Sequence, residues 1–239
     1  MVSKELITFS RKDKLPKHIE ITALLVADHF KRRRNYISQF CRLIKVSKRW
    51  KIQKIDEELV RWKDSFSKIE GTRNIIDIIC NGFPKCSSNE EIHKLRGALV
   101  EALLIGCFGG SEILNQNNYG WGAQVQLNKQ LEPQKLLKYH CNKSDNHDCH
   151  NRTTVDFGYW DGYHAKFFEC KAQPIGIGCK EVSYMKYLKN EMASERVSNE
   201  VFFVCPEHRD SIIMRLEEYG LSPVYKAWGT KELNMNLPA

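Results

Sequence analysis

The sequence predicts a mixed α/β fold that is preceded by a basic, all-helical N-terminal region. Apolar residues recur at intervals of three and four through residues 16–82, which is typical of amphipathic helices. From Ser88 onward, helical and strand patterns follow one another in the order α-β-β-β-α-β-α-β. Residues 152–172 form an apolar hairpin pattern within this series. We therefore expect a helical region over residues 1–87 and an α/β domain over residues 88–239.

The helical region carries all of the positive excess of the chain. The whole chain has 37 basic and 29 acidic residues, and residues 1–70 alone hold 18 of the basic and 9 of the acidic ones. Such a basic block is expected of a protein that contacts phosphate groups, although a solvated basic helical face gives the same pattern. Six side chains are our candidates for nucleic-acid contacts: Lys31, Arg32, Arg33, Arg34, Lys48 and Arg49.

A strong helix is predicted to begin after Ser88. Ser88 is a favourable N-cap, and Glu91 three residues later completes a capping-box pattern. The helix continues along an apolar stripe and is predicted to end at Gly109-Gly110, because glycine readily adopts the backbone conformation that closes a helix. Glu101 lies beside this stripe, one turn after Gly97, where the missing side chain leaves room.

The remaining elements are predicted from alternation and turn signals. Asp161-Gly162 is a turn pair that favours a tight hairpin between two apolar strands. In chain order we expect strands over 121–127, 152–160 and 164–172, a helix over 180–197, a strand over 201–205, a helix over 207–219 closed by Gly220, and a strand over 223–228.

The hairpin brings acidic and basic side chains together. Side chains alternate between the two faces of a strand, so Glu169 and Lys171 share one face with Phe167, whereas Cys170 points to the other face. Asp156 lies on the partner strand. Burying charged groups in such apolar surroundings is costly unless they are paired or bind a metal ion. The hairpin therefore predicts a divalent-metal site.

Mg²⁺ or Mn²⁺ at this position would support hydrolysis of a phosphodiester bond. Asp156, Glu169 and the backbone carbonyl of Cys170 are the expected ligands, and Glu101 is expected to hold a second ion or a metal-bound water. We expect Lys171 to orient or deprotonate the attacking water, helped by a lowered pKa, or to stabilise charge on the phosphate. The alternative is an ion pair between Asp156 and Lys171 on a solvated face, without a catalytic role.

These residues resemble the active-site motif of the PD-(D/E)xK nuclease superfamily, which has the restriction endonuclease-like fold. Arg96-Gly97 to Glu101 resembles the leading helix of the family with its acidic residue, Val155-Asp156 stands where the family has Pro-Asp, and Glu169-Cys170-Lys171 matches its (D/E)xK element. Gln173 resembles the polar residue often found two positions after the lysine, and we include it among the candidate catalytic residues. The resemblance covers about residues 88–228 and implies a helix, a three-stranded meander, a helix and a further strand.

Two departures from the family pattern narrow what the resemblance implies. Valine replaces the proline of the motif, a change that is widely tolerated in the family. The Gln-x-x-x-Tyr element of RecB-like exonucleases is absent after Lys171, which favours an endonuclease over an exonuclease.

We therefore expect a magnesium-dependent endonuclease that acts on DNA, in a setting such as restriction or anti-phage defence. Two alternatives stay open: a catalytically inactive nucleic-acid-binding subunit, and a partner-dependent DNA-end-processing subunit of a repair or transposition complex. Either a homodimer or a place in a larger complex is expected, since each chain offers one such site.

The sequence also predicts a cytoplasmic protein without membrane attachment. The N-terminus has no signal-peptide core, and no apolar run reaches the roughly 20 residues of a membrane span. The nine cysteines include no CxxC pair, which favours free thiols in a reducing compartment.

A second set of residues with metal-binding side chains precedes the hairpin: His140, Cys141, His147, Cys149 and His150. Histidine and cysteine are zinc ligands, but the spacing fits no common zinc motif. We therefore do not expect structural Zn²⁺ at Cys141, His147, Cys149 and His150.

Overall fold

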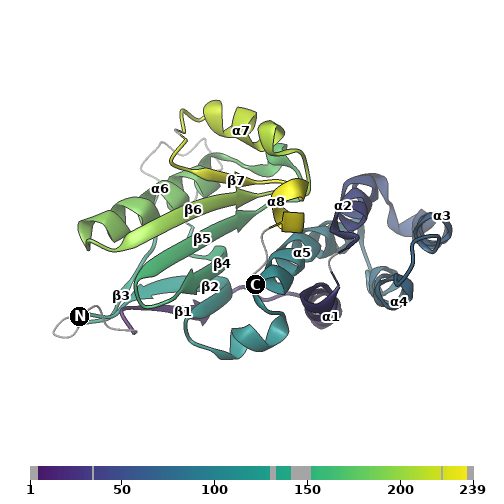
Figure 1. Cartoon of the computed structure of the whole chain (residues 1–239), viewed down its shortest axis with the longest axis horizontal. Coiled ribbons are helices and arrows are strands. Elements are labelled where there is room, and N and C mark those ends of the chain that lie inside the picture. Colours follow the sequence, from purple (N-terminus) through teal and green to yellow (C-terminus); the bar gives the residue numbers. More distant parts are fainter. Residues whose placement is uncertain (1–4, 34, 130–132, 141–151, 222, 236–239) are drawn as a thin grey trace.

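A computed structural model describes residues 5–33, 35–129, 133–140, 152–221 and 223–235. It contains a seven-stranded mixed sheet with helices on both faces, so the predicted mixed α/β class is confirmed (Figure 1). Within these described ranges, no helix combines the length and the apolar character needed to cross a membrane.

The sheet has the strand order β1-β2-β4-β5-β6-β7, and the short strand β3 pairs separately with β2. The pairs from β1 to β5 are antiparallel, whereas β5-β6 and β6-β7 are parallel. Parallel neighbours need a crossover connection, and helices α6 and α7 provide it. The strands are β1 (Ile7–Arg11), β2 (Tyr119–Leu127), β3 (Lys135–Leu136), β4 (Val155–Trp160), β5 (His164–Cys170), β6 (Ser198–Val204) and β7 (Lys226–Trp228).

The helices after Ser88 follow the predicted order, with a short helix added near the C-terminus. The α-helices are α1 (Lys17–Arg32), α2 (Ile37–Val46), α3 (Ile55–Phe66), α4 (Arg73–Gly82), α5 (Asn89–Phe108), α6 (Cys179–Ser194), α7 (Arg209–Glu217) and α8 (Thr230–Met235). The short 3-10 helices are η1 (Ser47–Arg49), η2 (Ile52–Lys54), η3 (Phe83–Lys85), η4 (Ser111–Asn115) and η5 (Pro174–Gly176).

The expectation of an all-helical region over residues 1–87 is wrong at its start. Residues Ile7–Arg11 form β1, which pairs antiparallel with β2 at one edge of the sheet (Figure 1). The Phe9 side chain of β1 lies over Gly158 of β4, where an added Cβ would stand 2.1 Å from the Phe9 ring. Five residues are too few for the alternation of a strand to be distinguished from the start of a helix. The helical pattern of residues 16–82 therefore does not extend back to residues 7–11.

Two apolar cores lie on opposite faces of the sheet. On one face, Phe157 and Phe168 pack with α5 and with helices α1–α4. On the other face, Phe167 and Phe203 pack with α6 and α7. The N-terminal helices therefore share one core with α5 and hold this helix against the sheet (Figure 1).

Helix α5 begins and ends as the sequence predicts. The backbone N–H of Glu91 donates to the Ser88 hydroxyl at 3.2 Å, and the helix closes at Gly109 and Gly110, whose φ angles are 132° and 84°. The carboxylate of Glu91 accepts from Ser87 instead of from the N-cap residue, so the reciprocal half of the predicted capping box is shifted by one residue.

Candidate active site

The hairpin of β4 and β5 brings Asp156, Glu169 and Lys171 together as predicted. The ladder between the strands ends at the pair Phe157–Phe168. Beyond this pair, Oδ2 of Asp156 accepts a hydrogen bond from the backbone N–H of Cys170 at 2.7 Å. Nζ of Lys171 lies 2.6 Å from Oε1 of Glu169, which is completely buried. The two carboxylates and the ammonium group therefore meet where the strands separate, at the end of β5.

Arg152, which was not predicted, bridges three carboxylates in this cluster. Its Nη2 donates to Oδ1 of Asp156 at 3.0 Å and to Oε2 of Glu169 at 2.6 Å. Its Nη1 donates to Oε1 of Glu181 at 3.3 Å, and Lys171 approaches the same oxygen at 3.3 Å. The guanidinium is mostly buried, so these charge-assisted hydrogen bonds are shielded from water.

Two further acids were also missed by the sequence reasoning. Glu181 stands in the first turn of α6, where its Oε2 accepts from the backbone N–H of Gly178 at 3.1 Å. Asp13 follows β1, and its Oδ2 accepts from the Thr154 hydroxyl at 3.2 Å. Glu181 could have been noticed as an acid three residues after a glycine N-cap. Asp13 gave no local signal, because it reaches the site only through the pairing of β1 with β2.

Glu101 approaches the cluster from α5. Its Oε2 accepts from the indole Nε1–H of Trp121 on β2, and the Asp156, Glu169 and Lys171 charges all act on it. Among the described residues, five carboxyl groups gather around two basic groups, Arg152 and Lys171. The acids are Asp13, Glu101, Asp156, Glu169 and Glu181.

Burial and like-charge repulsion raise the pKa of three of these acids, Glu169, Glu101 and Asp13. Burial raises the pKa of Glu169 to about 7; Asp156 adds to the rise, whereas Arg152 and Lys171 oppose it. Burial, and next the charge of Asp156, raise the pKa of Glu101 to about 8. The same two causes raise the pKa of Asp13. In the part of the chain that the structure describes, the acidic groups of this cluster therefore outnumber its two basic side chains.

The expected lowering of the Lys171 pKa is wrong. Burial does lower it, but the carboxylates of Glu169 and Asp156 outweigh this and raise the pKa above its ordinary value. Lys171 is thus held as an ammonium ion. This charge state suits donation to a water or a phosphate oxygen and does not suit removal of a proton from water.

Cys170 and Gln173, the other two predicted residues of the motif, form no side-chain hydrogen bond with the carboxylates in the part of the chain that the structure describes. The Cys170 side chain lies in the core on the α5 face, as the strand alternation predicts, and burial raises the pKa of its thiol well above the ordinary value. Its backbone carbonyl stays a predicted metal ligand. Gln173 is half-buried just before η5, and its side chain makes no hydrogen bond to the carboxylates among the described residues.

The predicted nucleic-acid-binding residues divide between two surfaces. Lys31 is paired with Glu112, and Arg33 donates from Nη1 to the Gly71 carbonyl at 3.2 Å, beside α4. Arg32 lines a hollow on the same side, between α1 and α4. Lys48 and Arg49 lie in η1, at the end of α2. Arg34 lies outside the described residues, as do the four positions considered for zinc, Cys141, His147, Cys149 and His150.

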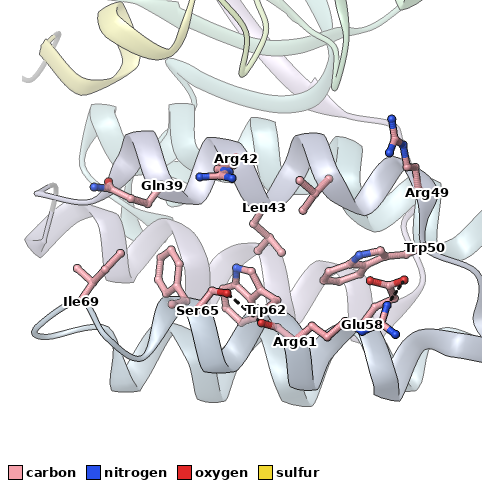
Figure 2. Close-up of a pocket in the computed structure, with 12 residues that line it drawn as sticks. Gln39, Arg42, Leu43, Arg49, Trp50, Glu58, Arg61, Trp62, Ser65 and Ile69 are labelled. Atoms are coloured by element: carbon pink, nitrogen blue, oxygen red, sulfur yellow. Dashed lines mark hydrogen bonds and ion pairs between the residues drawn. The ribbon is translucent and has the colours of Figure 1, made fainter.

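Arg49 belongs to a groove between α2 and α3 that the sequence reasoning did not single out (Figure 2). The groove has a volume of about 520 Å³, and its floor consists of apolar and aromatic side chains that include Trp50 and Trp62. Arg61 at its rim is paired with Glu58 at 3.6 Å. Arg42 and Arg49 make no ion pair or hydrogen bond with any other described residue. The residues that line the groove are Gln39, Arg42, Leu43, Val46, Arg49, Trp50, Glu58, Arg61, Trp62, Ser65, Phe66 and Ile69.

Comparisons with known proteins do not add to this geometry. No protein-family model matches the chain, and no curated protein matches it. The function must therefore be inferred from the charged cluster at the end of β5 and from the basic surfaces of the N-terminal helices.

Proposed function

We propose that the chain is a divalent-metal-dependent endonuclease that hydrolyses phosphodiester bonds in DNA. The observation that carries the proposal is the meeting of Asp156, Glu169 and Lys171 where β4 and β5 separate. The resemblance to PD-(D/E)xK nucleases, drawn from the same three residues, supports it. Restriction or defence is the proposed setting, with a cytoplasmic location and action as a homodimer or within a larger complex.

The chemistry of the cluster fits Mg²⁺ or Mn²⁺. The side chains that can donate to a metal are carboxylates, which these ions prefer. Burial and like-charge repulsion raise the pKa values of Glu101 and Glu169, and a divalent cation would favour their charged forms. Arg152 donates to one oxygen of Asp156 and to one of Glu169, so an ion held by both residues would compete with these two contacts.

Each residue then has a distinct task. Asp156 and Glu169 would hold the ion, which would supply charge neutralisation at the phosphate and a bound water of lowered pKa. Lys171 donates a hydrogen bond to the attacking water or to a phosphate oxygen. Glu101, kept in place by Trp121, accepts a hydrogen bond from a water on the α5 side of the cluster.

One observation favours the alternative of an inactive nucleic-acid-binding subunit. Arg152 already pairs with Asp156, Glu169 and Glu181, so the cluster can be neutralised in part without a metal. If the arginine cannot be displaced, the basic N-terminal helices would bind nucleic acid beside a site that does not cut. A DNA-end-processing subunit that needs a partner is distinguished by activity that appears only when the partner is added.

The test is cleavage of supercoiled plasmid, linear single-stranded DNA and RNA with Mg²⁺ or Mn²⁺, beside a reaction with EDTA. Lys171→Ala and Lys171→Gln should abolish metal-dependent cleavage. Lys166→Ala, which removes a lysine of β5 that lies on the opposite face of the strand from Glu169, should retain it. Binding without cleavage by the wild-type protein would favour the inactive subunit, and equal cleavage by wild type and Lys171→Ala would refute the assignment of the site.

A further inference from the structure

A separate group of metal-binding side chains lies where the first turns of two helices meet. His18 is in the first turn of α1, Glu91 is in the first turn of α5, and Cys86 follows η3 directly. Glu91 precedes Glu101 by ten residues of one helix, which is about 15 Å along the axis at 1.5 Å per residue. The group is therefore distinct from the charged cluster at the end of β5.

The ligand atoms of the three residues are close enough for one ion. A nitrogen of His18, the sulfur of Cys86 and an oxygen of Glu91 all lie within 4.8 Å of one another. Nε2 of His18 is 3.7 Å from Oε2 of Glu91. Ligands of a tetrahedral zinc site, at bond lengths of about 2.0–2.3 Å, are separated by roughly 3.3–3.8 Å. The observed spacing needs only a small closure to reach this geometry.

His18 provides an independent sign of a missing partner. Its Nε2 is sealed from solvent and makes no hydrogen bond with any described residue. Buried polar atoms are almost always paired, because an unpaired one loses its bond to water without replacement. The neighbouring Glu91 oxygen is too distant for a hydrogen bond, although it can form an ion pair when the imidazole is protonated.

Glu91 and Cys86 would supply the other two ligands, an oriented carboxylate and a buried sulfur. The backbone N–H and the hydroxyl of Ser87 donate to Oε2 of Glu91 at 2.7 and 3.0 Å, which orients the carboxylate and leaves lone pairs available. The Cys86 side chain is buried, and its sulfur lies with the ligand atoms of His18 and Glu91. Zinc binds cysteine as the thiolate, so metal binding would release the thiol proton to solvent.

We infer that His18, Cys86 and Glu91 bind a zinc ion, with solvent as the fourth ligand. Thiolate and imidazole ligands select zinc over magnesium, so this site and the oxygen-rich cluster would hold different metals. The ion would join the start of α1 to the start of α5. It would thus stabilise the packing of α5, the helix that carries Glu101, against α1. This role would not depend on the catalytic activity of the protein.

Cobalt substitution tests this site without reference to nuclease activity. Co²⁺ bound to a thiolate gives a charge-transfer absorption that oxygen ligands do not give. The full-length wild-type protein, freed of metal and titrated with Co²⁺, should show this absorption and saturate at one equivalent. The absorption should be lost in Cys86→Ser and reduced in His18→Asn and Glu91→Gln, with folding of each variant checked by circular dichroism.

Three controls locate the cobalt. Cys80→Ser removes a half-buried thiol six residues before Cys86 and should keep the absorption. A Cys141→Ser/Cys149→Ser double variant and Asp156→Asn should keep it as well. The proposal is overturned if folded wild-type protein gives no thiolate absorption, if folded Cys86→Ser retains it, or if it disappears with Cys141 and Cys149.

Discussion

The substitution Glu101→Gln should stabilise the protein at alkaline pH and have little effect at acidic pH. The raised pKa of Glu101 means that the folded protein favours the protonated acid. Below pH 4.5, the pKa of Glu101 in the unfolded chain, the folded protein keeps the full contribution of the protonated acid to its stability. This contribution is lost as the pH rises through about 8, the pKa in the folded protein. Glutamine has the same shape, can accept from the Trp121 indole and carries no charge at any pH, so its contribution does not change.

The size of the effect follows from the two pKa values. At 1.36 kcal/mol per pKa unit, the difference between 4.5 and about 8 costs wild type about 4 kcal/mol at pH 8. We expect about 3 kcal/mol, because Glu101 is only partly buried and water screens part of the repulsion from Asp156. At pH 5 the difference between variant and wild type should fall below about 1 kcal/mol.

Urea unfolding followed by circular dichroism at pH 5, 6, 7 and 8, in EDTA, measures this difference. Glu217→Gln is a matched control, since it makes the same substitution at an exposed position of α7 away from the cluster. Parallel stability profiles for Glu101→Gln and wild type would refute the reasoning, because they would mean that Glu101 is ionised without cost in the folded protein. Adding Mg²⁺ at pH 8 should narrow the gap by stabilising wild type more than the variant.

Three further predictions concern other parts of the molecule. Arg152→Gln should tighten Mn²⁺ binding about tenfold in calorimetry, because the ion no longer competes with a guanidinium at two of its ligands; weaker binding would mean that the arginine supports the site. Charge reversal of Arg42 and Arg49 together should weaken DNA binding and lower the salt dependence by about one to two counterions, measured by fluorescence anisotropy at several salt concentrations. Gly158→Ala should destabilise the fold by about 2 kcal/mol or more in urea unfolding, because the added methyl group collides with the Phe9 ring.

Matched controls exist for the last two predictions. Gly97→Ala adds a methyl group where no atom lies within 4 Å and should stabilise α5 by about 0.5–1 kcal/mol. Lys31→Glu reverses a charge that is already paired with Glu112, so it should reduce DNA affinity less than the charge reversal of Arg42 and Arg49. If Gly158→Ala is as stable as Gly97→Ala, the Phe9 ring does not lie over Gly158 as described.

Local signals carried most of what the sequence could reveal. Ser88 and the glycine pair after residue 108 mark the ends of α5 because capping is decided within a few residues. The faces of Glu169, Cys170 and Lys171 follow from the period of two in a strand, and the structure places them accordingly.

What the sequence could not reveal depends on contacts between distant segments. Asp13 and Glu181 reach the hairpin through β1 and α6, and no spacing along the chain predicts that meeting. The prediction for the pKa of Lys171 has the wrong direction, because the carboxylates of Glu169 and Asp156 raise this pKa more than burial lowers it. The basic residues of the N-terminal region were treated as one surface, yet α1 and α2 present them on two.

The hydrogen bond from the Cys170 amide to Asp156 allows one backbone N–H to report on the position of the Asp156 carboxylate. This amide protects its hydrogen through a side chain instead of through the strand ladder, so its exchange with deuterium depends on where the Asp156 carboxylate points. Any event that draws Asp156 toward a cation or a substrate will change the exchange rate and the NMR shift of one backbone N–H. A single resonance at the end of β5 can therefore follow occupation of the site in a variant that cannot cut.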